Sequence, residues 1–335
     1  MLLRIKKIAT GFVGLSEASV LLSLVVISIF FSIVNPQFLD VDNLILVARA
    51  SSYVAIATIG ASMVIITKGI DLSVGSMMGF AGITSSLLVS TMPGFYGSEI
   101  AGLGFGTGQV IILVLLMGLG IGVINGLMIS YMNLPPFIVT LAMLNVLRGL
   151  CYCFTGGWPI TKFPPSFSFL GQGFLWFIPM PVILLLGIAI LAWWVMNKTN
   201  YGLYIYAVGG NEQAVRLSGI NVKRLKTGVY AVAGLMGALA GIVLVSRLGV
   251  GDSTTASGYV LDVIAAAVIG GTSLSGGKGS VIGVVAGAVL LGIIRNGLVL
   301  LGVSAFYQQM AIGGVILVAI FLDWLKEKYS SYYIG

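Results

Sequence analysis

The sequence predicts an all-α polytopic membrane protein with about ten transmembrane helices. Of its 335 residues, 58% are hydrophobic and only 8% are charged, which is about a third of the charged share in a soluble domain. One soluble core cannot bury so much apolar surface, so the bilayer must act as solvent for much of it. The apolar residues also form separate runs, several of which approach or exceed the roughly 20 residues that a membrane-spanning helix needs.

Ten apolar runs, separated by polar or Gly/Pro breaks, give the predicted spans. They cover residues 18–34, 44–66, 72–91, 109–131, 137–156, 179–196, 227–246, 260–275, 280–300 and 306–323. The run at 260–275 is the shortest, and Lys68 to Asp71 interrupt the pattern. The first run ends in Asn35-Pro36-Gln37 without a small-residue cleavage site, which favours an uncleaved span over a signal peptide. We therefore expect one transmembrane domain over residues 1–335.

Basic residues orient these spans. With the N-terminus inside, twelve of the 17 Lys and Arg residues fall in cytoplasmic segments, whereas only Lys162 and Arg247 fall outside. The other three, Arg49, Arg148 and Arg295, lie within spans. Cytoplasmic loops of membrane proteins carry such an excess of positive charge. Both termini are therefore predicted to be cytoplasmic.

The residue types argue against an enzyme and against a nucleic-acid-binding protein. There is no histidine, the commonest metal ligand and general base, and Cys151 and Cys153 lie in an apolar run, as small buried hydrophobes do. The stretch GGTSLSGGKGS at 270–280 is not a phosphate-binding loop, because Gly279 follows Lys278 where Ser or Thr is needed. The +7 net charge gathers at segment ends rather than on one basic face. We expect no catalytic residue, metal, cofactor or nucleic acid.

Neutral hydrogen-bonding groups at membrane depth suit an uncharged, hydroxyl-rich solute, since an ion needs compensating charge. The candidate translocation-path residues are Asp71, Ser73, Asn125, Asn145, Ser275 and Asn296. The alternative for each is a contact between helices. Asp71 and Asp262 also fall within predicted spans, and an acid at membrane depth indicates function. The structural alternatives are that Asp71 pairs with Lys68 and that Asp262 caps the start of a helix.

Small residues recur every fourth position, a spacing that lets helix backbones approach closely in lipid. The ridges are Gly118, Gly122 and Gly126; Ala233, Gly237 and Gly241; Gly279, Gly283 and Gly287.

The two halves of the chain also share a sequence pattern. The LSVGS of 72–76 precedes Asn125-Gly126-Leu127, and the LSGG of 274–277 precedes Asn296-Gly297-Leu298. Since the third span runs outward and the eighth inward, a true repeat would be inverted, an arrangement that places a solute pathway near the midplane.

Residues 197–226 form a polar island between apolar runs, with five basic residues against one acid, Glu212. Within it, AVGGNEQAVRLSGI (207–220) has the spacing of a short helix in the segment 206–222, and Gly209-Gly210 are expected to permit the turn into this helix. One stripe of this helix holds Ala214, Leu217 and Ser218. Arg216 lies off the stripe and is expected to meet acidic residues of a partner. The island is predicted to be a cytoplasmic loop that docks another protein.

Four segments, at residues 60–82, 133–149, 206–222 and 259–308, closely resemble the permease subunits of ribose-type bacterial ABC sugar importers. The similarity extends from about residue 20 to 323. The resemblance implies that two permeases pair in the bacterial inner membrane, that separate cytoplasmic ATPase subunits hydrolyse ATP, and that a periplasmic sugar-binding protein delivers the sugar. It implies a neutral substrate, a ribose-like pentose or related sugar.

The resemblance also assigns the ATPase-coupling residues within the island. They are Gly209, Gly210, Asn211, Glu212, Ala214, Leu217, Ser218, Gly219 and Ile220. The alternative function for the chain is that of an ion-coupled secondary carrier. Such a carrier has no need of a docking loop as long as residues 197–226.

Overall fold

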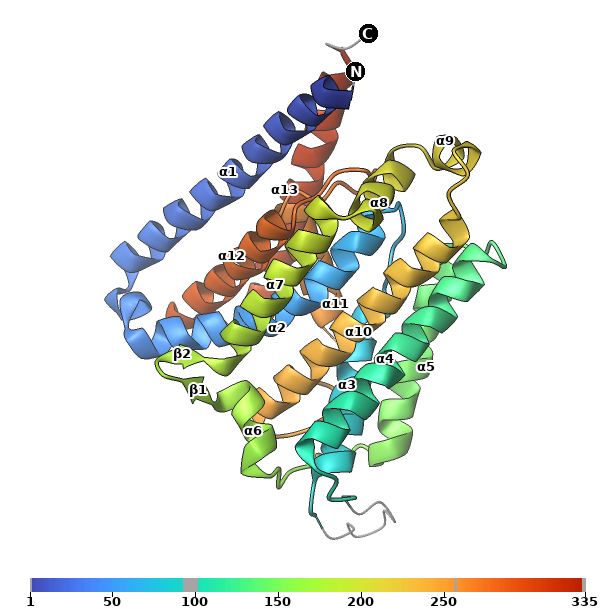
Figure 1. Cartoon of the computed structure of the whole chain (residues 1–335). Helices are drawn as coiled ribbons and strands as arrows, with labels where there is room; N and C mark the ends of the chain where they lie inside the picture. Colours follow the sequence, from blue (N-terminus) through green and yellow to red (C-terminus); the bar gives the residue numbers. More distant parts are fainter. Residues whose placement is uncertain (1, 93–101, 256–257, 333–335) are drawn as a thin grey trace.

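The computed structural model describes residues 2–92, 102–255 and 258–332, which form a bundle of inclined helices (Figure 1). The only sheet within these ranges is a small hairpin, in which β1 (Phe174–Leu175) pairs with β2 (Ile178–Pro179). The predicted all-α class is therefore confirmed for the part of the chain that is described.

Seven helices of the described part are long and apolar enough to cross a membrane. They are α1 (Leu2–Val34), α2 (Val41–Ile66), α4 (Thr107–Ser130), α5 (Pro136–Thr155), α7 (Met180–Lys198), α10 (Val222–Leu248) and α12 (Val281–Leu300). Three helices have shorter apolar segments: α3 (Val74–Val89), α11 (Tyr259–Ile269) and α13 (Ala305–Tyr332). Between them lie η1 (Pro36–Leu39), α6 (Pro165–Gln172), α8 (Asn200–Gly210) and α9 (Glu212–Leu217).

Two of the predicted boundaries are wrong for local reasons. The apolar run predicted at 260–275 ends at Ile269, because a glycine-rich turn follows in which Gly271, Gly276 and Gly277 have positive φ. The span predicted from 227 begins at Val222, because the Asn221 side chain caps the helix and extends it into the polar island. The predicted break after α2 is confirmed, since α3 begins only at Val74.

Helices α2 and α10 form the centre of the bundle. They pack against each other, α10 also packs on α3 and α4, and α2 packs on α11 and α12. Glycines of the predicted ridges lie at helix contacts. A Cβ on Gly122 would be 2.3 Å from the carbonyl oxygen of Tyr230, where α4 meets α10, and one on Gly287 would be 2.2 Å from that of Ala266, where α12 meets α11. The helix backbones therefore meet without side chains between them, as the ridges predicted.

The chain order α2–α5 matches the order α10–α13. In both, a long helix precedes a short one, and each leading helix packs on the third helix of the other set, α2 on α12 and α10 on α4. Helices α2 and α10 run in opposite directions, and the start of α1 and the end of α13 lie at the same end of the bundle as α9 (Figure 1). This arrangement supports an inverted repeat and cytoplasmic termini, both of which stay predictions.

Candidate coupling surface and translocation path

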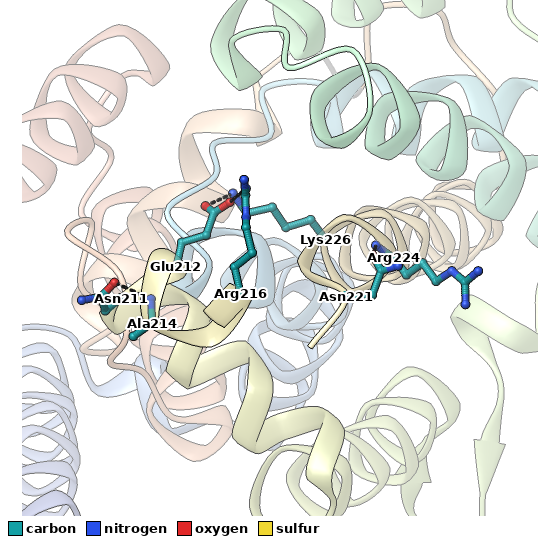
Figure 2. A network of polar contacts seen from close by, with 7 residues as sticks. All are labelled: Asn211, Glu212, Ala214, Arg216, Asn221, Arg224 and Lys226. Carbon is teal, nitrogen blue, oxygen red and sulfur yellow. Dashed lines mark hydrogen bonds and ion pairs between the residues drawn. The ribbon is translucent and has the colours of Figure 1, made fainter. Parts of the chain in front are cut away.

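The polar island folds into a short capped helix, α9, between two longer ones. The Oδ1 of Asn211 accepts a hydrogen bond from the backbone N–H of Ala214 at 3.0 Å, which caps the start of α9 (Figure 2). The same residue is extended, with φ −149° and ψ 98°, so it separates α8 from α9. The single helix predicted over 206–222 is therefore wrong.

The end of α9 and the start of α10 are also set by local residues. Gly219 has φ +82°, a conformation that favours glycine, and it follows the last turn of α9. Asn221 then caps α10 by accepting a hydrogen bond from the backbone N–H of Arg224 at 3.0 Å (Figure 2). Two asparagine caps and one glycine turn thus make a compact helix–turn–helix out of the island.

The predicted stripe of α9 faces outward. Leu217 is 89% exposed, Ala214 and Ser218 are exposed as well, and Val215 is buried in the main apolar core. Helix α9 therefore rests on Val215 and presents a small residue and an apolar side chain to its surroundings. An apolar helix face of this kind fits a groove on a partner protein.

Glu212 connects α9 to α10. Its carboxylate accepts a hydrogen bond from Nη2 of Arg216 at 3.1 Å and one from Nζ of Lys226 at 2.6 Å (Figure 2). Burial raises the pKa of Glu212, but the hydrogen bonds and charges of Lys226 and Arg216 outweigh it and hold the pKa below its usual value. Arg216 is paired with Glu212 within its own helix, and its side chain is 64% exposed, so its contact with a partner's acids stays a prediction.

Gly209 and Gly210 do not form the predicted turn, because both lie in the last turn of α8. Gly209 is buried against other backbone: a Cβ there would lie 1.9 Å from the carbonyl oxygen of Ile66 and 2.3 Å from the nitrogen of Gly277. A Cβ on Gly210 would meet nothing within 4 Å. Gly209 is therefore needed for close approach rather than for a turn.

Three segments meet at this end of α8. The backbone N–H of Gly277 donates to the carbonyl of Ile66 at 2.9 Å, and the Tyr206 hydroxyl donates to the carbonyl of Gly279 at 3.0 Å. The Nζ of Lys68 donates to the carbonyl of Gly210 at 3.4 Å. The island is thereby joined to the turn that follows α2 and to the turn that precedes α12.

Three of the predicted path residues form one buried network at the break between α2 and α3. The Oδ1 of Asp71 accepts from the backbone N–H of Ser73 at 2.8 Å and from its hydroxyl at 2.5 Å, and the side-chain amide of Asn125 donates to the Ser73 hydroxyl at 3.1 Å. All three side chains are buried. Asp71 therefore organises the entry to α3, and the alternative of a pair with Lys68 is not realised.

The other three path residues lie elsewhere. Asn296 and Asn43 exchange side-chain hydrogen bonds of 2.7 and 3.0 Å, which join α12 to α2. Asn145 is exposed on α5 and donates to the carbonyl of Leu141, and Ser275 is exposed in the turn before α12. The six predicted residues therefore do not line a common surface in this chain.

An ion pair between α11 and α12 was not predicted from the sequence. The Nη2 of Arg295 lies 3.0 Å from Oδ2 of Asp262, whereas Asp262 was expected to cap a helix whose N-cap is in fact Gly258. Two opposite charges within predicted spans were a usable signal, because an unpaired charge is costly there. Their separation of 33 residues concealed the pairing.

Comparisons with known proteins agree over most of the chain. Residues 43–320 match the family described as branched-chain amino acid transport system/permease component. The chain is 39% identical to the ribose import permease protein RbsC of Escherichia coli (strain K12), over 93% of this chain and 95% of that one. It is 42% identical to the protein of the same name from Bacillus subtilis (strain 168), over 91% and 92%.

A further relative is the galactose/methyl galactoside import permease protein MglC of Escherichia coli (strain K12), which is 36% identical over 93% of this chain and 95% of that one. No solved structure matches the chain. The family match and the near full-length identities coincide with a bundle that has seven helices able to span a membrane in its described part. The chain therefore belongs to the permease family whose members are described as components of the branched-chain amino acid transport system.

Proposed function

We propose that this chain is the membrane-spanning subunit of a binding-protein-dependent ABC importer and forms the path of a neutral sugar across the bacterial inner membrane. The strongest support is identity of 39–42% to ribose import permeases over more than nine-tenths of the chain. The galactose/methyl galactoside permease, at 36%, points to the same solute class. The family description names branched-chain amino acids instead, so leucine is the natural competitor in any test.

The ATPase partner would bind α9. The observation that carries this assignment is the exposed stripe of Ala214, Leu217 and Ser218 on a capped helix outside the apolar spans. Ala214 permits close approach and Leu217 supplies an apolar anchor of the kind that fills a pocket in a partner. ATP hydrolysis is assigned to this ATPase partner and not to the membrane-spanning chain.

Movement of the ATPase would pass from α9 into the bundle through rigid contacts. The Glu212–Lys226 ion pair connects α9 to α10, which is continuous to the far end of the bundle, and α8 is held at Gly209 against the turns at Ile66 and Gly277. A push on α9 would therefore tilt packed helices as units. Two copies of the chain moving in this way, each with inverted halves, would expose the path alternately to the two sides.

Sugar uptake in cells tests this function. Cells without other ribose and galactose importers would express the chain with its cognate ATPase and binding protein, and uptake of labelled ribose, galactose and leucine would be compared. The proposal predicts sugar uptake that stops when the lysine of the ATPase phosphate-binding loop is replaced and that survives a protonophore while ATP is maintained. Uptake that ignores the ATPase variant but collapses with the protonophore would instead indicate a secondary carrier.

A further inference from the structure

A cavity of about 340 Å³ lies in the half of the bundle farther from α9. It is bordered by residues 46–54 of α2, the start of α11, residues 288–296 of α12, one residue of α13 and Arg247 near the end of α10. Its volume falls within the roughly 300–1,000 Å³ of small-molecule sites. The polar residues that line it include Ser51, Tyr53, Tyr259, Asp262, Arg295 and Asn296.

The cavity contains the ion pair of Asp262 and Arg295. The Arg295 side chain is 45% exposed and the Asp262 side chain 11%, although both helices lie within the bundle's apolar segments. A guanidinium exposed to hydrocarbon is expensive, so charged side chains at this depth face protein or a water-filled space. The two charges compensate each other and leave donor and acceptor capacity for a polar, uncharged ligand.

Aromatic and hydroxyl groups also line the cavity. The hydroxyls of Tyr53 and Tyr259 lie 3.0 Å apart, and Nη1 of Arg247 donates to that of Tyr53 at 3.2 Å. Ser51 is 2% exposed, and its hydroxyl has no hydrogen-bond partner among the described residues. It faces Gly292, where an added Cβ would lie 2.2 Å from the hydroxyl oxygen. A buried hydroxyl without a partner needs a ligand or water, since leaving it unpaired costs free energy.

Helix α11 begins at this cavity. It has only 11 residues, and Tyr259 and Asp262 of its first turn both line the space. Discontinuous helices whose ends lie inside the membrane frame solute sites in transporters, because their free backbone groups are polar. The short helix and the unpartnered Ser51 hydroxyl are independent observations that meet at one place.

We propose that this cavity is a binding site for one sugar ring on the translocation path, an inference that rests on the function proposed above. The Arg295 guanidinium donates to ring hydroxyls while the Asp262 carboxylate accepts from them, and the buried Ser51 hydroxyl lies in the wall behind them. The partly exposed ring of Tyr259 supplies apolar surface for the sugar's C–H groups. Of the path residues predicted from sequence, only Asn296 belongs to this site.

Cysteine labelling tests whether water and sugar reach the cavity. The native Cys151 and Cys153 are first replaced by alanine, and Ala50→Cys, which lines the cavity, is compared with Ala48→Cys, which lies on the other side of α2 and does not line it. In the assembled importer, a charged methanethiosulfonate reagent should modify Ala50→Cys at least ~10-fold faster than Ala48→Cys, and excess ribose or galactose should slow only the former. No labelling at Ala50→Cys, or its disulfide cross-linking between two copies, would show a surface covered by a second subunit and overturn the site.

A charge-free double variant separates sugar contact from structural support. Asp262→Asn with Arg295→Gln removes both charges together and keeps side chains of similar size, so neither partner is left as an unpaired charge. We expect an apparent melting temperature close to that of the wild type and sugar uptake at least ~10-fold lower. Wild-type uptake in this variant, or a loss of uptake that only follows a loss of folded protein, would overturn the site.

The two proposals fail in different ways. If the unaltered chain carries no sugar, the function itself is wrong. If the unaltered chain carries sugar and the cavity variants carry it equally well, only this site is wrong. Protection of Ala50→Cys by leucine but not by ribose or galactose would contradict the sugar assignment.

Discussion

The carboxylate of Glu212 on α9 accepts a hydrogen bond from Nζ of Lys226 on α10 at 2.6 Å. This contact ties the exposed helix to one of the two central helices of the bundle. Because Lys226 is mostly buried and Glu212 is 36% exposed, the pair is partly shielded from solvent. The carboxylate of Glu212 therefore adds a side-chain link between α9 and α10 to the packing of Val215 in the core.

The Glu212 contact predicts a dependence on pH. The pKa of Glu212 is lowered from 4.5 in the folded chain by Lys226 and Arg216, against the effect of burial. Its contribution to holding α9 is therefore present above about pH 4.5 and is lost as the pH falls through the lower folded-state pKa. The distance between spin labels at Gln213 and Arg224 should be narrowly distributed near neutral pH and broad in acid. Glu212→Gln should be broad at both; if it matched the wild type at neutral pH, the contact would not position α9.

Gly209 and Gly210 form a matched pair for the junction at the end of α8. Gly209→Ala puts a Cβ 1.9 Å from the Ile66 carbonyl oxygen, so the backbones must separate, at a cost of about 1–3 kcal/mol for overpacking. Gly210→Ala meets nothing within 4 Å. We expect lower melting temperature and lost uptake for Gly209→Ala and near wild-type values for Gly210→Ala. Equal behaviour of the two variants would contradict the close contact.

A second pair tests the packing of α4 on α10. Gly122→Leu drives a side chain into the backbone of Tyr230, 2.3 Å from the added Cβ, whereas Gly120→Leu points into open space. Only Gly122→Leu should reduce yield and melting temperature in detergent, with uptake falling in parallel. Unchanged yield, melting and uptake in Gly122→Leu would mean that this ridge faces lipid.

Asp71 is predicted to matter through hydrogen bonding at the start of α3. Asp71→Asn keeps an oxygen acceptor for Ser73, whereas Asp71→Leu removes two bonds from a buried site, at about 1–3 kcal/mol. Asp252, which makes the same turn with Thr254 in a more exposed loop, provides the control Asp252→Leu. Of the three variants, Asp71→Leu should have the lowest melting temperature. Transport that is indifferent to both Asp71 variants would make the segment ordinary connecting structure.

Hydropathy predicted the seven helices of the described part that are long and apolar enough to cross a membrane, because such a helix must satisfy its own backbone and present apolar side chains. Because such helices are apolar on all sides, the sequence does not show which side of each helix faces the inside of the bundle. Asn125 on α4 is buried while Asn145 on α5 is exposed, yet both stand in runs that are apolar all round. Only the packing of neighbouring helices distinguishes them.

Two asparagines in the polar island are local signals for helix starts that were not used in the prediction. Asn211 and Asn221 each stand three residues before the backbone N–H that they cap, a pattern that divides the island into separate helices. Pairings between distant residues had no such signal. Glu212 with Lys226 and Asp262 with Arg295 are set by which helices lie side by side, and a chain read alone does not contain that information.

The most direct test of the coupling role is Ala214→Arg, with Gln213→Arg as its control. Both positions are exposed on α9, but only Ala214 lies on the stripe with Leu217 and Ser218. Co-purification of the cognate ATPase with each permease variant should be lost for Ala214→Arg and retained for Gln213→Arg, while both variants stay folded in the membrane. An Ala214→Arg permease that still recruits the ATPase and imports sugar at the wild-type rate would remove α9 from the coupling interface and contradict the account.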